Sequence, residues 1–222
     1  MDKKNIAVKT SLNNYYLYKF ILLLYRFFRS FQNSRGLKVK NKGIAKIIKD
    51  IIGKDNYVEI GEGCILEPLR VKVYGNNNSL IIGKNVRVAK GCNFWMEGNN
   101  ITIKIGDNCS FNYDVHLCAQ GDNMNILFGK DCMIANRIIV RTSDSHPIYD
   151  LANNQMTNPP SSIIIGDHVW IAPQARIFKG VNVGSNSIIG SGAIVTKDIP
   201  ENSLVVGIPA KVVKQNVTWS RE

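Results

Sequence analysis

The chain has 222 residues, of which 45% are hydrophobic and 20% charged, so it can bury a full core. Its 28 Lys and Arg residues outnumber its 17 Asp and Glu residues, which gives a formal net charge of +11. This excess favours an anionic partner, such as coenzyme phosphates, an acidic polymer or a membrane surface. A nucleic-acid partner is disfavoured, because the repeats described below contain no recognition motif and no basic block interleaved with aromatic residues.

Residues 15–31 predict an amphipathic helix, and we assign residues 1–45 to a helical appendage. Three basic residues interrupt the segment, and its longest uncharged inner run, Phe20–Tyr25, is too short to span a bilayer. No small-residue cleavage site follows, which argues against a signal peptide. Two interpretations stay open: the helix packs on the protein or on a neighbouring subunit, or it lies on anionic lipid. The apolar positions follow helical spacing and are Leu17, Phe20, Ile21, Leu24, Phe27, Phe28 and Phe31.

From residue 46 to the end, a six-residue repeat dominates the sequence. An α-helix has a period near 3.6 and a strand a period of 2, so neither element explains the spacing. A six-residue repeat is typical of a parallel β-helix, in which each coil stacks on the preceding one. Residues 46–222 are therefore predicted to form one all-β domain. The repeat is most regular at Ile165, Ile171, Ile177, Val183, Ile189 and Val195.

Similar phrases begin upstream at Ile60, Ile82, Ile105 and Phe128, at intervals of 22 or 23 residues. Three sides of six residues need only 18, so each of these coils carries a few additional residues. We place them at corners, because Gly and Asn tolerate the positive φ of a tight turn. The predicted corners are Gly75-Asn-Asn-Asn, Gly98-Asn-Asn and Gly121-Asp-Asn.

The interval from Phe128 to Ile165 is 37 residues, about one coil longer than the repeat requires. Asp, Asn and Pro residues punctuate residues 141–161, so this insert is predicted to be a loop and not a strand. Long loops on rigid scaffolds frequently carry function.

The five cysteines are interpreted as reduced packing residues of a cytoplasmic protein. Cys118 has no CxxC partner. The other four occupy the fifth position of a repeat, where small inward side chains stand elsewhere, and are Cys64, Cys92, Cys109 and Cys132.

Among the three histidines, His146 is the candidate for chemistry. It lies in the long loop, with Asp144 and Asp150 near enough in sequence to orient an imidazole. Histidine is the side chain most readily poised to accept a proton near neutral pH. His116 and His168 stand at outward positions of repeats, where exposed polar residues are expected.

Four motifs occur in a fixed order along the chain. Ser-Asp-Ser-His146-Pro is followed by Ile165-Gly-Asp-His-Val-Trp170-Ile-Ala, by Ile189-Gly-Ser-Gly-Ala-Ile-Val-Thr-Lys197-Asp-Ile-Pro, and by Gly207-Ile-Pro-Ala-Lys211-Val-Val-Lys214. Over residues 55–214 the chain resembles the hexapeptide-repeat acyltransferases, and among them the acetyltransferases that act on sugar hydroxyls. The spacing from His146 to Trp170 is also similar to that of bacterial capsule O-acetyltransferases that modify sialic-acid polymers.

The resemblance implies a left-handed coil and a homotrimer with active sites in grooves between neighbouring rods. Acetyl-CoA is the implied co-substrate, and no metal is expected. His146 would act as general base in a direct transfer, and Trp170 would line the site; Asp144, Tyr149 and Asp150 are candidates for orienting His146 or binding the acceptor. The implied coenzyme contacts are Pro173, Ser191, Thr196, Lys197, Lys211 and Lys214.

Two departures from the family pattern bear on these expectations. Lys211 and Lys214 stand where some relatives carry Arg, so bidentate phosphate contacts are not available there. No residue matches the Asn that stabilises the transition state in galactoside-type members, so the acceptor pocket differs from theirs.

The preferred acceptor is a bacterial surface polysaccharide, and the net charge favours an acidic, sialic-acid-type capsule. Transfer to a small acceptor, such as a monosaccharide, amino sugar, serine or drug, is the alternative on the same fold. A zinc lyase of the β-helix carbonic anhydrase type is disfavoured by the spacing of His116, His146 and His168. A non-enzymatic β-helix scaffold is the remaining alternative. We expect a cytoplasmic protein, at the inner face of the membrane if residues 15–31 bind lipid.

Overall fold

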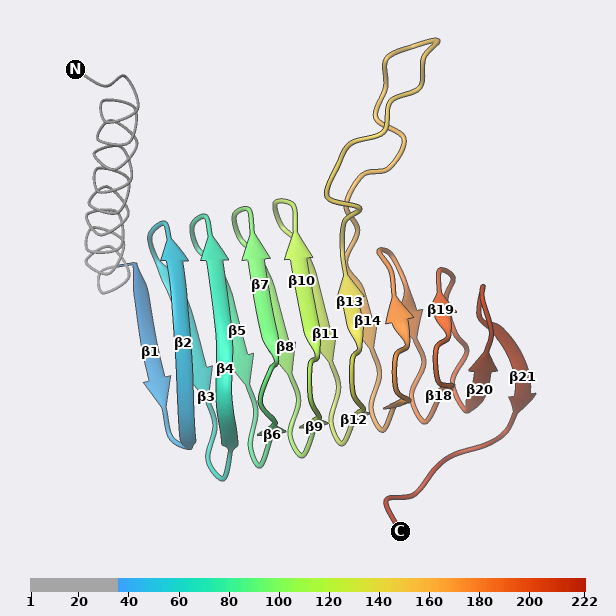
Figure 1. The fold of residues 1–222 in the computed structure, drawn as a ribbon, viewed down its shortest axis with the longest axis horizontal. Helices are drawn as coiled ribbons and strands as arrows, with labels where there is room; N and C mark the ends of the chain where they lie inside the picture. Colours follow the sequence, from blue (N-terminus) through green and yellow to red (C-terminus); the bar gives the residue numbers. More distant parts are fainter. Residues whose placement is uncertain (1–35) are drawn as a thin grey trace, which may run out of the picture.

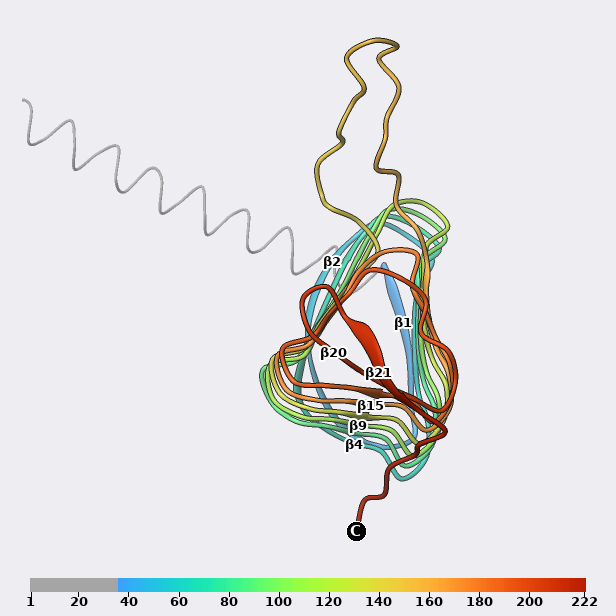
Figure 2. The ribbon, with the colours of Figure 1, turned by 90° about the vertical axis from the view of Figure 1, so that its right-hand side faces the viewer.

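The computed structural model describes residues 36–222, which consist of strands joined by turns and loops. The strands stack along one long axis (Figure 1), and the view down this axis has a triangular outline (Figure 2). Neighbouring strands of the stack pair in parallel, and only the last pair, β20 with β21, is antiparallel. The parallel β-helix predicted from the six-residue period is confirmed.

Three faces form the prism, and we number them in chain order. Face 1 is a separate seven-stranded sheet. Its strands are β1 (Leu37–Asn41), β3 (Asn56–Ile60), β5 (Ser79–Ile82), β8 (Thr102–Ile105), β11 (Asn125–Phe128), β14 (Ile163–Ile165) and β17 (Asn182–Val183).

Faces 2 and 3 belong to one 14-stranded sheet that bends at β4 (Ile65–Tyr74), whose start pairs with β6 and whose end pairs with β7. The strand β2 (Ile44–Ile52) also pairs with β4. Face 2 continues through β6 (Arg87–Val88), β9 (Ser110–Phe111), β12 (Met133–Ile134), β15 (Trp170–Ile171), β18 (Ile188–Ile189), β20 (Ser203–Val206) and β21 (Lys211–Gln215). Face 3 continues through β7 (Asn93–Glu97), β10 (His116–Gln120), β13 (Ile139–Arg141), β16 (Arg176–Ile177) and β19 (Ile194–Val195).

The core is a column of inward side chains, stacked in register from coil to coil. Phe94, Phe111 and Phe128 come from three different faces and meet inside the prism. Their rings make edge-to-face contacts, with centroids 5.8 Å apart for the first pair and 5.2 Å for the second. Such contacts add to the free energy gained from burying the rings. The six-residue period therefore records which side chains face inward.

The predicted corners are confirmed by the backbone. Gly75 has a φ of 133° and Gly98 a φ of 132°, values that residues with a Cβ atom rarely adopt. Asn78 is fully buried at the first of these corners, and its side chain donates to the Gly98 carbonyl (2.9 Å) and accepts from the Ile101 amide (2.9 Å). Stacked amide side chains of this kind replace the strand ladder where the chain turns.

The four cysteines at the fifth repeat position are buried, and all five cysteines are free thiols. The Cys92 Sγ donates to the Asn112 carbonyl of the next coil at 3.1 Å, and burial raises the pKa of this thiol to about 11. The interpretation of these residues as small inward packing groups is confirmed.

The β-helix begins earlier than the predicted boundary at residue 46. Strand β1 starts at Leu37 and pairs with β3, and β2 starts at Ile44. The β1 strand carries no repeat of its own and is defined by its pairing partner, so the six-residue period missed it.

The predicted helix at residues 15–31 lies outside the described residues. No helix within residues 36–222 is long and apolar enough to cross a membrane.

Candidate active site

The insert predicted at residues 141–161 forms an arm that leaves the prism between β13 and β14, at the corner where faces 3 and 1 meet (Figures 1 and 2). Its outer part is a short hairpin, in which Tyr149 and Met156 form an antiparallel bridge and the Thr157 amide donates to the Ile148 carbonyl at 2.8 Å. The loop prediction is therefore confirmed, with one added feature: the arm has an ordered ladder of its own.

His146 lies on the outgoing segment of this arm, which leads away from β13. The residue before it, Ser145, is hydrogen-bonded to the prism. The Ser145 Oγ accepts from the Arg141 guanidinium (2.5 Å) and donates to the Gln120 Oε1 (3.1 Å). Gln120 is buried and donates in turn to the Glu97 carboxylate at 2.8 Å. Ser145 has a φ of +71°, in the left-handed region, so the chain turns sharply just before His146.

The returning segment of the arm, which leads back to β14, holds His146 through Asn158. The Asn158 Nδ2 donates to the main-chain carbonyl of His146 (3.0 Å) and to the Asp144 carboxylate (2.9 Å). Its Oδ1 accepts from the amide of Ile148 at 2.6 Å. The Lys179 ammonium, on the next coil of the prism, donates to the Asp144 carboxylate (2.5 Å) and to the Asn158 carbonyl (2.9 Å).

Asp144 and Asp150 were predicted to orient the His146 ring, but their carboxylates have other partners. The Asp144 carboxylate accepts from Lys179 and Asn158, and these hydrogen bonds hold its pKa below the usual range. The Asp150 carboxylate caps the turn by accepting from the Ala152 amide at 2.7 Å. Tyr149, the third candidate, is 53% exposed on the hairpin.

The imidazole of His146 is exposed, and within residues 36–222 its ring makes no hydrogen bond. A ring that is fixed through its backbone and open to solvent is available to a substrate. The chain thus presents a potential proton acceptor on an ordered support.

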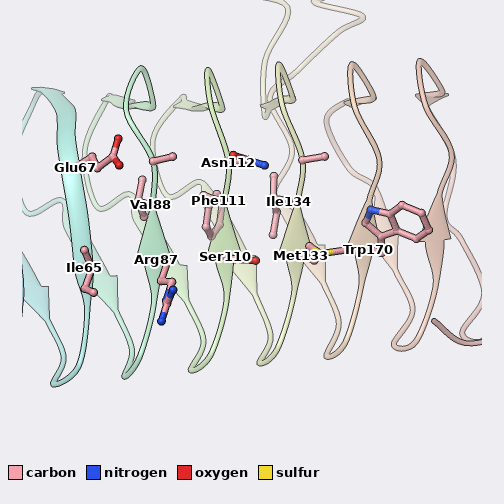
Figure 3. Close-up of a pocket in the computed structure, with 12 residues that line it drawn as sticks. Ile65, Glu67, Arg87, Val88, Ser110, Phe111, Asn112, Met133, Ile134 and Trp170 are labelled. Atoms are coloured by element: carbon pink, nitrogen blue, oxygen red, sulfur yellow. The ribbon is translucent and has the colours of Figure 1, made fainter. Parts of the chain in front are cut away.

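Trp170 stands at the outward position of β15 on face 2, between Met133 and Ile188 in register. It is half-buried and borders a groove of about 400 Å³ that runs along the face (Figure 3). The groove is mostly apolar, with a few polar groups. Its lining residues are Ile65, Glu67, Arg87, Val88, Ala89, Ser110, Phe111, Asn112, Met133, Ile134, Ala135 and Trp170.

The C-terminal residues after β21 form a strap that the sequence did not predict. Trp219 is 8% exposed and lies 6.3 Å from Trp170, measured between ring centroids. The Arg221 guanidinium donates to the Asp131 carboxylate (3.0 Å) and to the Ser110 Oγ (3.2 Å), a residue of the groove. We define residues 216–222 as the strap; it covers the corner between faces 1 and 2 beside the groove.

The prediction that His168 is an exposed polar residue is wrong. Its ring is covered by Trp219, and its Nδ1 lies 2.7 Å from the Asp131 carboxylate. The repeat places His168 outward, as expected, but a segment distant in sequence folds back over it. The sequence signal for this contact is a single aromatic residue, Trp219, in a mostly polar C-terminal stretch.

The six predicted coenzyme contacts are all exposed and lie on the last coils. Pro173 and Ser191 stack at the corner of faces 2 and 3, where the Gly192 amide donates to the Pro173 carbonyl at 2.9 Å. Thr196 and Lys197 follow β19, and Lys211 and Lys214 lie on β21. The structure thus divides the six residues among three places on the rod.

His146 and Trp170 lie on different sides of the same chain. The arm leaves at the corner of faces 3 and 1, whereas Trp170 is on face 2 (Figure 2 shows the arm and β15 on opposite sides). A site that uses both side chains therefore needs a second copy of the chain. Within residues 36–222, no group of three or more His, Cys, Asp or Glu side chains is placed to hold a metal ion.

No protein-family model matches the chain. Among solved structures, the polysialic-acid-specific acetyltransferase NeuO is 32% identical with a TM-score of 0.65, over 84% of this chain and 83% of that one. The polysialic acid O-acetyltransferase OatWY is 29% identical with a TM-score of 0.74, over 85% of this chain and 90% of that one.

Among curated proteins, the polysialic acid O-acetyltransferase of Escherichia coli O1:K1 / APEC is 38% identical over 89 residues, which are 40% of this chain and 29% of that protein. The chain spans between 29% and 36% of the length of the curated relatives that it matches. The NeuO match, in contrast, extends over most of both chains, and on this ground the protein belongs to the hexapeptide-repeat acyltransferases, whose fold is the left-handed parallel β-helix.

Proposed function

We propose that the protein transfers an acetyl group from acetyl-CoA to a sugar hydroxyl of an acidic bacterial surface polysaccharide. The observation that carries the proposal is the exposed imidazole of His146. The preceding residue, Ser145, is bonded to Arg141 of the prism, and the His146 carbonyl is held by Asn158 of the arm. Family membership supplies the reaction class, and the relatives named above supply the acceptor class. The net charge of +11 agrees with an anionic acceptor.

The chemistry assigned to His146 is general-base catalysis. A sugar hydroxyl is almost entirely un-ionised at neutral pH and is therefore a weak nucleophile. His146 accepts its proton as the oxygen attacks the thioester carbonyl, and the imidazolium then protonates the departing CoA thiolate. This assistance is typically worth about 10²–10⁴-fold in rate. No Ser or Cys nucleophile motif accompanies His146, so the transfer is direct.

The active site is proposed to lie between two copies in a homotrimer. His146 of one copy and Trp170 of a neighbour would face each other, since one chain holds them on different sides. Four hydrophobic residues of the arm are largely exposed in the single chain, which supports a partner surface for it. They are Ile148, Tyr149, Leu151 and Met156.

The coenzyme is proposed to lie along the last coils. Pro173 and Ser191 offer a flat corner for the pantetheine chain, and Thr196 and Lys197 continue this surface at the next corner. Lys211 and Lys214 on β21 offer ammonium groups to the phosphates. The protein would act in the cytoplasm, at the membrane surface if residues 15–31 bind lipid.

Release of free CoA tests the proposal. Purified protein is given acetyl-CoA with polysialic acid, with other acidic and neutral capsule polymers, and with monosaccharides. We expect release with the acidic polymer that both His146→Ala and Trp170→Ala abolish or strongly reduce. A preference for monosaccharides would contradict the polymer assignment but keep acetyl transfer, and no release with any acceptor would contradict the activity itself.

A further inference from the structure

Asn158 is buried in a segment whose other residues are exposed or partly exposed. Between residues 143 and 161 it is the one residue classed as buried, at 9% exposure. A polar side chain is costly to bury unless its hydrogen-bonding groups are satisfied. Here both Nδ2 protons and the Oδ1 have partners. A buried amide with every hydrogen-bonding group paired indicates that the side chain has a specific structural role.

This role concerns the backbone on either side of Pro147. The Asn158 side chain donates to the carbonyl of His146 and accepts from the amide of Ile148, while Pro147 between them has no amide hydrogen. The Asn158 side chain thus acts like the main chain of a neighbouring strand over these three residues. It fixes the direction in which the Cα–Cβ bond of His146 leaves the backbone.

Lys179 connects this arrangement to the prism. Its ammonium contacts both the Asp144 carboxylate and the Asn158 carbonyl, and it belongs to the corner that follows β16. The Lys179 side chain is 23% exposed, and the pairing holds the pKa of Asp144 below its usual range. A continuous path of contacts therefore runs from the rod through Lys179 and Asn158 to the backbone of His146.

We propose that Asn158 is a positioning residue for His146, and that Lys179 and Asp144 hold Asn158 in place. We call the hydrogen bonds that Asn158 makes with the His146 carbonyl, the Ile148 amide and Asp144, together with the contacts of Lys179, the clip. The inference rests on the proposed function for the catalytic role of His146, but the existence of the clip does not. The clip sets where the imidazole stands relative to the substrate. A displacement of about 1 Å of a catalytic group can reduce a rate by about 100-fold.

Two variants separate the clip from its surroundings. Asn158→Leu keeps the approximate size but removes both Nδ2 protons and the Oδ1 acceptor. Lys179→Met removes the ammonium at nearly constant length, and Lys179→Arg restores a donor as the conservative rescue. Asn153→Ala is the matched control, because Asn153 lies on the same arm and its Oδ1 accepts from the Gln155 amide at the hairpin tip.

The first measurement is hydrogen exchange of the peptide that contains residues 143–150, which needs no activity. We expect the Ile148 amide of Asn158→Leu to exchange at least about tenfold faster, because its acceptor is gone. The midpoint of thermal unfolding should be unchanged, because the arm is outside the core. Unchanged exchange would overturn the clip whatever the enzyme does.

The second measurement is the steady-state rate of CoA release with polysialic acid. Asn158→Leu and Lys179→Met should lower kcat by about 10- to 100-fold with KM for acetyl-CoA within about twofold, and Lys179→Arg should recover part of kcat. Faster exchange with a normal kcat would overturn the positioning role. A wild-type protein without activity would contradict the proposed function, and the exchange result would still decide the clip.

Discussion

The indole of Trp219 stacks on the imidazole of His168, with ring centroids 4.3 Å apart and planes 8° from parallel. The Trp219 Nε1 donates to the His168 carbonyl at 2.8 Å, and the His168 Nε2 lies 3.0 Å from the Trp219 carbonyl. Two residues 51 positions apart in sequence are thus joined by three contacts. Through them the strap is fixed beside the groove that Trp170 lines.

Replacing Trp219 should loosen the strap and weaken its attachment to the coil that carries His168. Trp219→Ala removes a buried aromatic ring and its hydrogen bond, so we expect the free energy of unfolding to fall by up to about 3 kcal/mol. Urea denaturation measures this change. Thr218→Ala, at an exposed neighbouring position, should leave stability within about 0.5 kcal/mol. Equal effects of the two variants would contradict a structural role for Trp219.

Acid should release the strap through Asp131. Burial raises the pKa of Asp131, but hydrogen bonds from His168 and Arg221 outweigh it and leave the pKa below 3.8. The stabilisation is therefore complete above the unfolded pKa of about 3.8 and is lost as the pH falls through the lower, folded value. In a Trp95→Phe, Trp170→Phe background, the fluorescence of Trp219 should shift to the red over this range.

Asp131→Asn provides the control for this titration. It removes the carboxylate that both His168 and Arg221 contact, so its Trp219 emission should already be red-shifted at neutral pH. Identical titrations of the variant and its parent would show that Asp131 does not hold the strap.

His146→Ala should abolish most catalysis without affecting the fold. The loss of a general base is expected to lower kcat by about 10²–10⁴-fold. Thermal unfolding should be unchanged, because the ring is exposed and makes no hydrogen bond within residues 36–222. CoA release is the measurement, with His116→Gln as a histidine control on face 3. Full activity of His146→Ala would exclude it as the base.

Complementation tests whether two copies build each site. If His146 of one copy works with Trp170 of another, mixed trimers of His146→Ala and Trp170→Ala chains should regain intact residues in about a quarter of their sites. We expect co-refolded mixtures to recover a comparable fraction of wild-type CoA release. Mixtures as inactive as either parent would place both residues in a site within one chain.

The aromatic column should dominate the stability of the middle coils. Phe111 is 2% exposed and contacts both Phe94 and Phe128. Phe111→Ala leaves a cavity between them, so the free energy of unfolding should fall by about 3–5 kcal/mol. Phe111→Leu refills part of the space and should cost clearly less in the same denaturation experiment. Equal losses would show that the cavity is not the cause.

The period of six determined the fold, because an inward position must be apolar or small on every side of every coil. The same logic identified the corners at Gly75 and Gly98 and the packing role of Cys92. Strand β1 has no such signal, since its place depends on its pairing with β3. The boundary at residue 46 was late for this reason.

The residue types and their order in the sequence also singled out His146 and Trp170. What holds His146 was not readable from sequence. Asn158 reaches the His146 carbonyl from 12 residues away, and Lys179 reaches the Asp144 carboxylate from 35 residues away. Such contacts have no period. The strap over His168 is a further case, spanning 51 residues.

The sequence alone therefore determined the coil and its candidate chemistry, because both follow from local repetition and residue type. Only the tertiary structure decided which side chains support the arm and hold the strap beside the groove, because those contacts join segments that the repeat does not relate.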